Sequence, residues 1–268
     1  MNIDRKRFFD LIRASLFGGR MSARQVGGIE MILQGFVLRH PNGDIRWLAY
    51  MLATAFHETA TAMVPVRETQ RSDEIVPPTV ETAIARLESS WRAGKMPWVK
   101  TAYWRKDAEG KSWLGRGLPQ LTHRANYDKL GQAIGTDLVK DPELALVDEV
   151  AVAIMVVGMT RGLFTTRKLA DYFGPRIDDA QEARRIINGV ESAGKVAGYH
   201  RLFLAAIKAA FVVVVAKPIA AEPRRHPSPS AGPSSSFPRS PRSPPLRRAF
   251  SHASPTRWAS RGPPHELE

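Results

Sequence analysis

Apolar residues recur every three to four positions along most of the first 216 residues of this chain. After Asp44, for example, they fall at Leu48, Met51, Leu52, Ala55 and Phe56. This spacing gives an α-helix one apolar face, whereas a half-buried strand requires strict alternation of apolar and polar residues. No stretch of residues 1 to 216 sustains such alternation, so the sequence predicts an all-α domain.

Capping residues mark where several of these helices begin. Ser22, Asp44 and Thr79 each precede an apolar stripe, and their side chains can accept a hydrogen bond from a free N–H of the first turn. Thr165 could cap a helix in the same way, and Gly94 could end the one that follows Thr79. Further helices are expected to begin at Asp141-Pro142 and Asp148 and to cover 168–173, 180–187 and 194–212. Two long irregular segments, 65–78 and 95–121, interrupt them.

The composition changes near Lys217. Residues 217–268 hold twelve of the twenty prolines and ten serines, together with nine Lys/Arg and three Asp/Glu. A segment of this kind has too few apolar residues to form a core. We therefore expect one folded domain over residues 1–216 and a disordered Pro/Ser/Arg-rich tail over residues 217–268.

The net charge of +13 and the absence of cysteine limit the function classes. Without cysteine the chain has no disulfide, zinc–thiolate site or cysteine nucleophile. Asp10 and Arg13 interrupt what would be the apolar region of a signal peptide, so no secretory signal is expected. The longest apolar stretch, 202–216, is interrupted by Lys208 and is shorter than the roughly 20 residues that span a bilayer.

Glu58 is the first candidate for chemistry, in the segment Phe56-His57-Glu58-Thr59 at the end of the expected helix. At about 100° per residue, Glu58 lies roughly 70° from the centre of the apolar stripe, at the edge of the buried face. Partial burial can keep a carboxyl group protonated near neutrality, which a general acid requires. A zinc protease is excluded because Thr61 stands where an H-E-x-x-H motif needs its second histidine.

The second candidate segment, residues 113–127, reads WLGRGLPQLTHRANY. Two glycines and a proline bracket an arginine, and polar side chains follow into a helix. The segment is not a dinucleotide-binding loop, because Gln120 replaces the third glycine and no strand precedes it. By itself the segment indicates only a structured loop.

In combination these segments resemble glycoside hydrolase family 19, the chitinase-like enzymes, and more closely its bacterial and prophage endolysin branch. The resemblance rests on FHET at 56–59, GRGLPQLTHRANY at 115–127, IGTDL at 134–138 before Asp141-Pro142, and RIING at 185–189, in the same order. The endolysin branch is suggested by KMPWV at 95–99 and YWR at 103–105. The resemblance covers about residues 20–210 and implies a lysozyme-like helical domain with a catalytic cleft.

The resemblance also implies roles for individual residues. It places the general acid on Glu58 and the hydroxyl that holds the attacking water on Thr122. Sugar-binding side chains would be Gln120, Asn126 and Asn188, with Tyr127 lining the cleft. Arg116 could pair with a catalytic carboxylate or could simply lock the loop, and the sequence leaves both open.

The general base is harder to place. In plant members it lies about 22 residues after the acid, where this chain has Val80; in the endolysin branch it lies about ten residues on, where this chain has Glu68. Glu74 and Glu81 remain alternatives, although Glu81 also suits the first turn of a helix. We expect Pro65 to break the helix after Ala62, so that Glu68 faces Glu58 across a cleft above Gln120 and Thr122.

Four aromatic residues could stack on sugar rings or could instead belong to the core: Trp47, Trp98, Tyr103 and Trp104. Two histidines, His57 and His123, are expected to be structural.

The sequence thus predicts an inverting two-carboxylate hydrolase of β-1,4 bonds in peptidoglycan, a phage-type endolysin that needs no metal or organic cofactor. A chitinase acting on N-acetylglucosamine polymer is the alternative, and a catalytically silent carbohydrate-binding or structural phage protein is the second. The expected partner is the polysaccharide, with no specific nucleic acid, no stable membrane insertion and a monomeric state. The protein would be made in the cytoplasm and would act on the cell wall if released.

Overall fold

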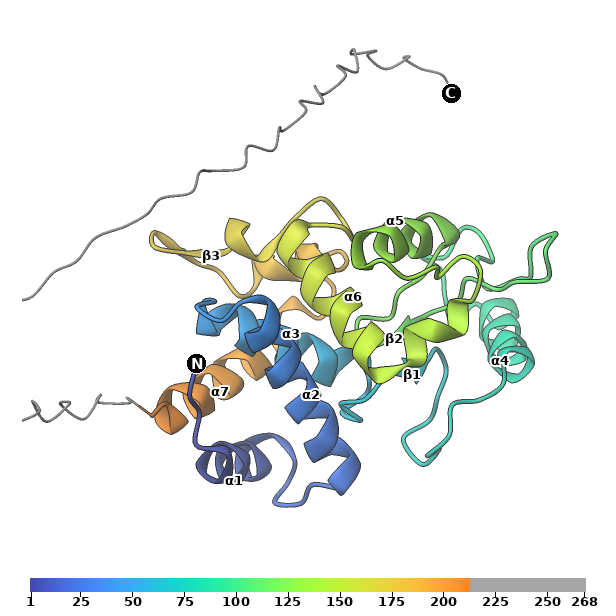
Figure 1. Cartoon of the computed structure of the whole chain (residues 1–268). Coiled ribbons are helices and arrows are strands. Elements are labelled where there is room, and N and C mark those ends of the chain that lie inside the picture. The colour runs from blue at the N-terminus through green and yellow to red at the C-terminus, as the bar shows by residue number, and fades with distance from the viewer. Residues whose placement is uncertain (213–268) are drawn as a thin grey trace, which may run out of the picture. The chain divides into compact units, whose positions relative to one another are not determined.

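The computed structural model describes residues 1–212, and helices account for most of its regular structure (Figure 1). The α-helices are α1 (Arg5–Leu16), α2 (Ala23–Arg39), α3 (Ile45–Glu58), α4 (Val80–Arg92), α5 (Arg124–Ile134), α6 (Asp148–Arg161) and α7 (Ala193–Ala210). Short 3-10 helices are η1 (Pro142–Leu146), η2 (Leu169–Asp171) and η3 (Glu182–Ile186). Two antiparallel pairs of two-residue strands join β1 (Val66–Arg67) to β2 (Arg116–Gly117) and β3 (Phe173–Gly174) to β4 (Ile177–Asp178). The predicted all-α, lysozyme-like class is confirmed.

The predicted caps of three helices are confirmed. The Ser22 side chain accepts from Gln25 N at the start of α2, and the Gln25 side chain accepts in return from Ser22 N, which completes a capping box. Asp44 and Thr79 accept from the first turns of α3 and α4. Short-range hydrogen bonds therefore set these helix starts.

The sequence analysis missed one helix and misjudged one cap. It did not predict α1, whose Asp4 side chain accepts from Arg7 N. Thr165 does not cap the following helix, because its hydroxyl donates to the carbonyls of Arg185 and Ile186. The expected helix over 168–173 is the short η2, and that over 180–187 is η3.

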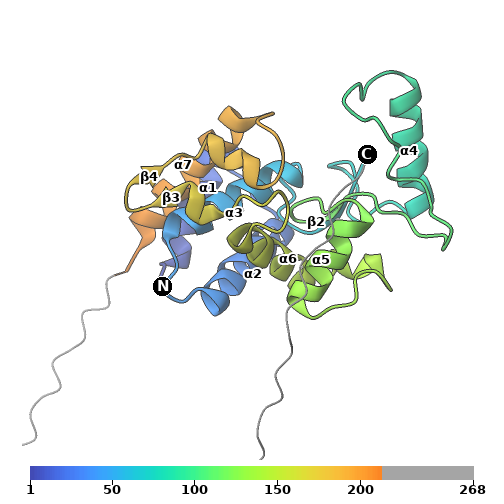
Figure 2. The ribbon, with the colours of Figure 1, turned by 90° about the horizontal axis from the view of Figure 1, so that it is seen from above.

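The largest hydrophobic core is built from α1, α2, α3, α6 and α7. Helix α3 is buried on every side from Leu48 to Phe56, and α7 lies along it (Figures 1 and 2). Helix α6 is also buried almost throughout, which explains why it shows little amphipathic pattern.

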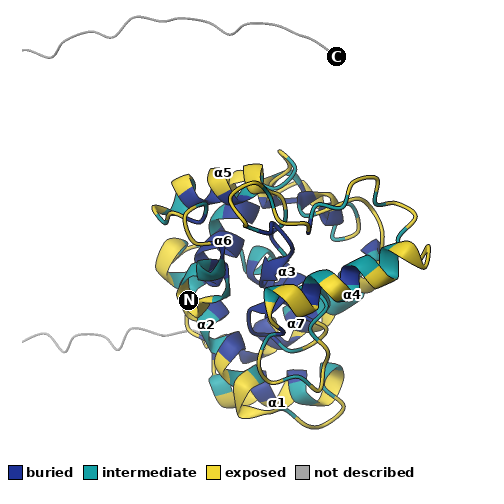
Figure 3. Cartoon of the chain, turned by 90° about the vertical axis from the view of Figure 1, so that its right-hand side faces the viewer, coloured by how far each residue is buried: buried dark blue, intermediate teal, exposed yellow. Residues whose placement is uncertain are grey.

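Two smaller clusters pack beyond this core. One surrounds α5 and includes Trp113, Tyr127 and Leu130; the other joins Ala83 and Leu87 of α4 to Trp104 and Leu114. Helix α4 lies at the opposite side of the described region from α1 and α7 (Figure 2). It remains largely exposed, with only Ala83 and Leu87 buried (Figure 3).

The two irregular segments meet in the β1–β2 pair, and a group of ionic contacts holds that pair. Val66 pairs with Gly117 and Arg67 with Arg116. Both arginine side chains are buried and both bind Glu143 of η1: Arg116 Nη2 lies 2.8 Å from Glu143 Oε1, and Arg67 binds Glu143 Oε2. One carboxylate thus neutralises two buried guanidinium groups and joins three distant parts of the chain.

No helix within residues 1–212 is long and apolar enough to cross a membrane. The predicted tail, residues 217–268, lies outside the described residues, as do 213–216. The domain boundary at residue 216 therefore stays a prediction.

A buried histidine in α7 predicts a pH-dependent stability. The His200 ring packs against Tyr50 and Phe173, its Nε2 has no hydrogen-bond partner among the described residues, and burial lowers its pKa from 6.5 to about 4. Asp44, Asp178, Arg46 and Lys208 interact electrostatically with this ring. Between pH 6.5 and 4 the unfolded chain binds a proton that the folded chain does not. The stabilisation of the folded state by neutral His200 is therefore complete above pH 6.5 and is lost as the pH falls through 4.

We expect His200→Phe to reduce the loss of unfolding free energy between pH 7 and pH 4 by up to about 3 kcal/mol relative to wild type. Urea unfolding at pH 7, 6, 5 and 4 measures this difference. The control is His123→Phe, which replaces an exposed histidine and should keep the wild-type dependence of the unfolding free energy on pH. An unchanged pH dependence in His200→Phe would show that the pKa of His200 is the same in the folded and the unfolded chain.

Replacing the shared carboxylate should destabilise the fold. Glu143→Gln leaves two buried arginines without a counterion, a change that typically costs about 3–5 kcal/mol when the pair is fully buried. Because Glu143 is 44% exposed, we expect about 2 kcal/mol, measured by urea unfolding. The control is Glu81→Gln, which removes an exposed ion pair with Lys106. A loss for Glu143→Gln no larger than for this control would contradict the structural role.

Candidate active site

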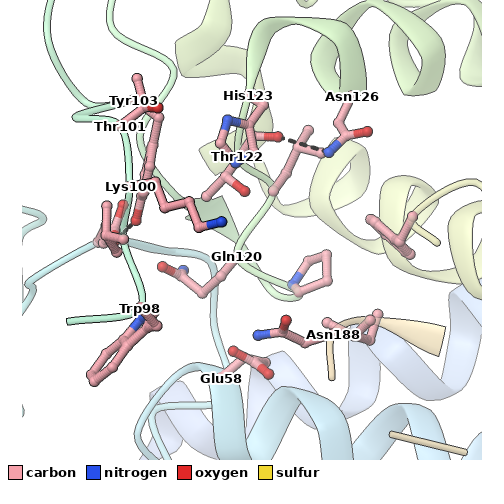
Figure 4. A pocket seen from close by; sticks show the side chains of 16 residues that line it. Glu58, Trp98, Lys100, Thr101, Tyr103, Gln120, Thr122, His123, Asn126 and Asn188 are labelled. Carbon is pink, nitrogen blue, oxygen red and sulfur yellow. Dashed lines mark hydrogen bonds between the residues drawn. The ribbon is translucent and has the colours of Figure 1, made fainter. Parts of the chain in front are cut away.

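A cleft of about 770 Å³ separates the large helical core from the two smaller clusters. Figure 4 shows Glu58 and Asn188 on one side of it and Thr122, His123 and Asn126 on the other. Its remaining lining residues are Glu68, Trp98, Val99, Lys100, Thr101, Tyr103, Pro119, Gln120, Leu121, Phe164 and Ile187. Both candidate carboxylates thus line a single cavity.

Glu58 is the last residue of α3, and its side chain is 15% exposed. It therefore lies at the edge of the buried face, where the helical pattern placed it. Its Oε1 accepts a 2.5 Å hydrogen bond from Nη1 of the buried Arg184 in η3. The guanidinium group also donates to the carbonyl of Glu191, so it fixes the carboxyl group of Glu58 against the cleft wall.

The chain leaves α3 directly after Glu58, and Pro65 is not what ends the helix. The hydroxyl of the buried Thr59 donates to Ala55 O at 2.7 Å and accepts from Met63 N at 2.9 Å. Ala60, Thr61 and Met63 have positive φ angles, which no helix can contain. The prediction that the chain turns after Ala62 is therefore wrong by about one helical turn, because Thr59 supplies the competing hydrogen bonds.

Glu68 follows β1 directly and is held by the segment that contains β2. Its backbone N–H donates to Gly115 O at 2.8 Å, and its Oε2 accepts from Gly115 N at 2.7 Å. Its Oε1 accepts from the Tyr103 hydroxyl at 2.6 Å. A Cβ atom on Gly115 would lie 3.3 Å from Glu68 Oε2 and 2.7 Å from Gln120 Oε1, so glycine permits this close approach.

The two alternative bases point elsewhere. Glu74 forms a bidentate ion pair with Arg86, whose hydrogen bonds lower the pKa of Glu74 to about 2. Glu81 is 69% exposed and pairs with Lys106, which lowers its pKa. Neither residue lines the cleft.

A tight loop presents Gln120 and Thr122 to the cleft. Arg116 and Leu121 exchange two backbone hydrogen bonds across the loop, and Gly117 adopts the positive φ of 85° that the turn requires. Gln120 also has a positive φ, and its side-chain amide donates to Val66 O and Gly117 O. The Gln120 side chain thus joins this loop to β1. The positive φ of Gln120 also means that a strained backbone residue lies at the candidate site.

Two side-chain amides that the resemblance suggested as sugar-binding groups, Asn126 and Asn188, lie on opposite sides of the cleft (Figure 4). Asn126, in α5, donates to Thr122 O at 3.0 Å. Asn188, after η3, accepts from Gly189 N and is otherwise exposed. Both amides thus retain hydrogen-bonding groups for a sugar polymer.

Two predicted substrate-binding residues belong to the core instead. Tyr127 is fully buried, does not line the cleft, and donates from its hydroxyl to Leu114 O at 2.7 Å. Arg116 binds Glu143, the carbonyls of Ser112 and Leu114, and the Tyr127 hydroxyl, so it locks the loop and pairs with no cleft carboxylate. The motif identified the loop but not which of its side chains turn inward.

Of the aromatic candidates, Trp98 and Tyr103 line the cleft, and Trp98 is exposed. Trp104 is fully buried, and Trp47 packs on the core with its Nε1 donating to Phe173 O. His123, expected to be structural, is exposed on the cleft wall next to the Tyr103 ring.

His57 does not line the cleft; burial lowers its pKa, and its ring lies near that of Tyr199. Within residues 1–212, no three histidine, aspartate or glutamate side chains gather in a way that could hold a metal ion.

Two basic residues at the site, Arg184 behind Glu58 and Lys100 in the cleft, were not predicted from the sequence. Arg184 stands one position before the RIING segment, and only the fold brings it to Glu58. Lys100 lies between two lining residues, and its amine points into the cavity in Figure 4. It forms no ion pair with the described residues. In the sequence, the position of Lys100 within the aromatic-rich segment 98–104 was the one indication that it lies in the cleft.

Residues 92–160 match the family model for chitinase class I, glycoside hydrolase family 19. The chain is 54% identical to an acidic 27 kDa endochitinase of Solanum lycopersicum over 39 residues, 15% of this chain and 16% of the relative. It is 43% identical to chitinase 12 of Oryza sativa subsp. japonica over 61 residues (23% and 18%), and 44% identical to endochitinase 1 of Solanum tuberosum over 43 residues (16% and 14%).

The chain thus spans less than a fifth of the length of these curated relatives. The matched model region contains the 98–104 segment, the Gln120 loop and α5, but neither Glu58, Glu68 nor Asn188. Over residues 92–160 this chain is therefore similar to the chitinase class I proteins of glycoside hydrolase family 19.

Proposed function

We propose that this protein hydrolyses β-1,4 glycosidic bonds in a polymer that contains N-acetylglucosamine, with Glu58 as general acid and Glu68 as general base. The observation that supports this most directly is that both glutamates line the same cleft while Glu74 and Glu81 do not. Each carboxyl group is fixed by side-chain or backbone donors, which is what a two-carboxylate glycosidase requires.

In the proposed reaction Glu58 donates its proton to the glycosidic oxygen and Glu68 removes a proton from the attacking water. The bond to the leaving sugar breaks as the water oxygen attacks from the opposite face, so the anomeric configuration inverts. A general acid must carry a proton, and the role of Glu58 therefore requires its contact with Arg184 to loosen when the polymer enters. Thr122 would hold the water, while Gln120, Asn126 and Asn188 would orient the sugar.

We propose peptidoglycan as the polymer, and hence a phage-type endolysin that acts on the cell wall once released. The cation of Lys100 in the cleft supports this choice. In peptidoglycan, every second sugar carries a lactyl ether with a peptide that bears carboxylates, whereas chitin carries no charge. A lysine without an intramolecular partner among the described residues is suited to attract such a carboxylate.

Chitin is the second candidate, because the similar plant proteins bear the names endochitinase and chitinase. A silent carbohydrate-binding or structural phage protein is the third. Offering the purified full chain peptidoglycan and chitin side by side, and identifying the new reducing ends, separates the three.

The two glutamates should be individually indispensable to hydrolysis. We expect Glu58→Gln and Glu68→Gln each to lower kcat at least about 100-fold without loss of polymer binding, since general acid–base catalysis typically contributes 10²–10⁴. Reducing-sugar release and sedimentation with insoluble polymer measure the two quantities. The initial product of the wild type should be the inverted anomer by NMR.

Glu74→Gln serves as the control, because that carboxylate binds Arg86 outside the cleft. An active Glu68→Gln together with an inactive Glu74→Gln would move the base to Glu74. A retained anomer would rule out the inverting mechanism.

Lys100 should raise kcat/KM only on a polymer that carries negative charge. We expect Lys100→Gln to lower kcat/KM on peptidoglycan about three- to fivefold, the size of a solvent-exposed ion pair, and to leave it unchanged on chitin oligosaccharides. The difference should shrink at high salt, because exposed charges are screened. Lys95→Gln, which removes an exposed lysine outside the cleft, is the matched control. Equal losses on both polymers would contradict charge recognition by Lys100.

A further inference from the structure

We infer that Tyr103 is a positioning residue that holds Glu68 in its orientation and charge state for catalysis. This inference rests on the proposed function of Glu68 as the general base. It concerns the hydroxyl group of Tyr103, which donates to Glu68 Oε1 at 2.6 Å.

The carboxyl group of Glu68 is held at both oxygens by donors from different parts of the chain. Tyr103 OH binds Oε1, and Gly115 N, 2.7 Å away, binds Oε2. Two donors on two oxygens fix the plane of a carboxyl group, which a single donor leaves free to rotate. The remaining lone pairs can then face a water in the cleft that Glu68 lines.

Both donors are electrically neutral. No lysine, arginine or histidine among the described residues forms an ion pair with Glu68, whereas Glu58 has Arg184. Hydrogen bonds to a carboxylate stabilise its charged form, and a general base must be charged to accept a proton. The Tyr103 hydroxyl is therefore one of the two donors that hold the Glu68 carboxyl group in the cleft.

Tyr103 keeps its own proton. Burial, with the negative charge of Glu68 beside it, raises the pKa of Tyr103 well above its usual value of 10.0. The hydroxyl therefore remains a donor over the whole range in which the enzyme could work, and it cannot become a competing base.

The position of the Tyr103 ring is fixed by α4. Tyr103 packs edge-on against Trp104, with ring centroids 5.1 Å apart, and Trp104 is fully buried against Ala83 and Leu87. Trp104 Nε1 donates to Glu88 Oε1 at 2.8 Å, and Arg105 pairs with the same carboxylate. The largely exposed helix α4 thereby anchors the segment that delivers the hydroxyl group to Glu68.

Tyr103→Phe removes only this hydroxyl group and tests the inference in the full chain. We expect kcat at neutral pH to fall roughly tenfold, with KM within about twofold of wild type, because the substrate is bound by other residues. The acidic limb of the pH–rate profile should move up by about one pH unit, because a carboxylate with one donor fewer is protonated more readily.

Tyr172→Phe is the matched control, since Tyr172 is nearly buried but does not line the cleft. It should leave the kcat profile unchanged. If Glu68→Gln is inactive and Tyr103→Phe keeps the wild-type acidic limb, the inference is wrong while the proposed function stands. If Glu68→Gln remains active, the assignment of the base itself has failed.

A second substitution covers the case in which Tyr103→Phe does not fold. Incorporating 3-fluorotyrosine in place of Tyr103 preserves the shape of the ring and makes the hydroxyl a stronger donor. The acidic limb should then move to lower pH, opposite to the effect of phenylalanine. An acidic limb that stays in place or moves to higher pH in the fluorotyrosine variant would overturn the positioning role.

Discussion

The candidate site depends on one carboxylate, that of Glu143, which neutralises two buried arginines from distant segments. Arg67 and Arg116 are paired neighbours in β1 and β2, and an unneutralised pair of guanidinium groups would repel across that ladder. With Glu143 between them, the two irregular segments meet. Glu68 then follows β1, and the Gln120 loop follows β2. The part of the cleft wall that carries Glu68 and the Gln120 loop is therefore held by this ionic contact.

The helices could be read from the sequence because their signals are local. The side chains of Ser22, Asp44 and Thr79 accept hydrogen bonds from backbone groups two or three residues away. The apolar stripes predict which face of each helix is buried. The same reasoning placed Glu58 at the edge of a buried face. It failed at Pro65 because Thr59, which looks like an ordinary helical residue, ends α3 by bonding to Met63 N.

The contacts across the cleft could not be read in this way, because they join residues far apart in the chain. Arg184 and Glu58 are 126 positions apart in the sequence, and Gly115 and Glu68 are 47 positions apart. Tyr127 and Arg116 lie in the most recognisable motif and yet turn into the core. Arg116 lies in an irregular loop, where neither period 2 nor period 3.6 indicates which way a side chain points. A motif thus identifies the segment, and packing decides its inward and outward faces.

The two glutamates are held by chemically different partners, and this difference bears on how their roles divide. A charged guanidinium group binds Glu58. In the proposed reaction this contact has to loosen before the carboxyl group of Glu58 can carry and deliver a proton. Only neutral donors bind Glu68, and their geometry does not have to change for Glu68 to accept a proton. Entry of a polymer beside Asn188 would disturb the Arg184 side of the cleft, while α4 and Trp104 keep the Tyr103 side fixed. Under the proposed division of roles, the fold preorganises Glu68 as the base, and Glu58 becomes competent as the acid when substrate arrives.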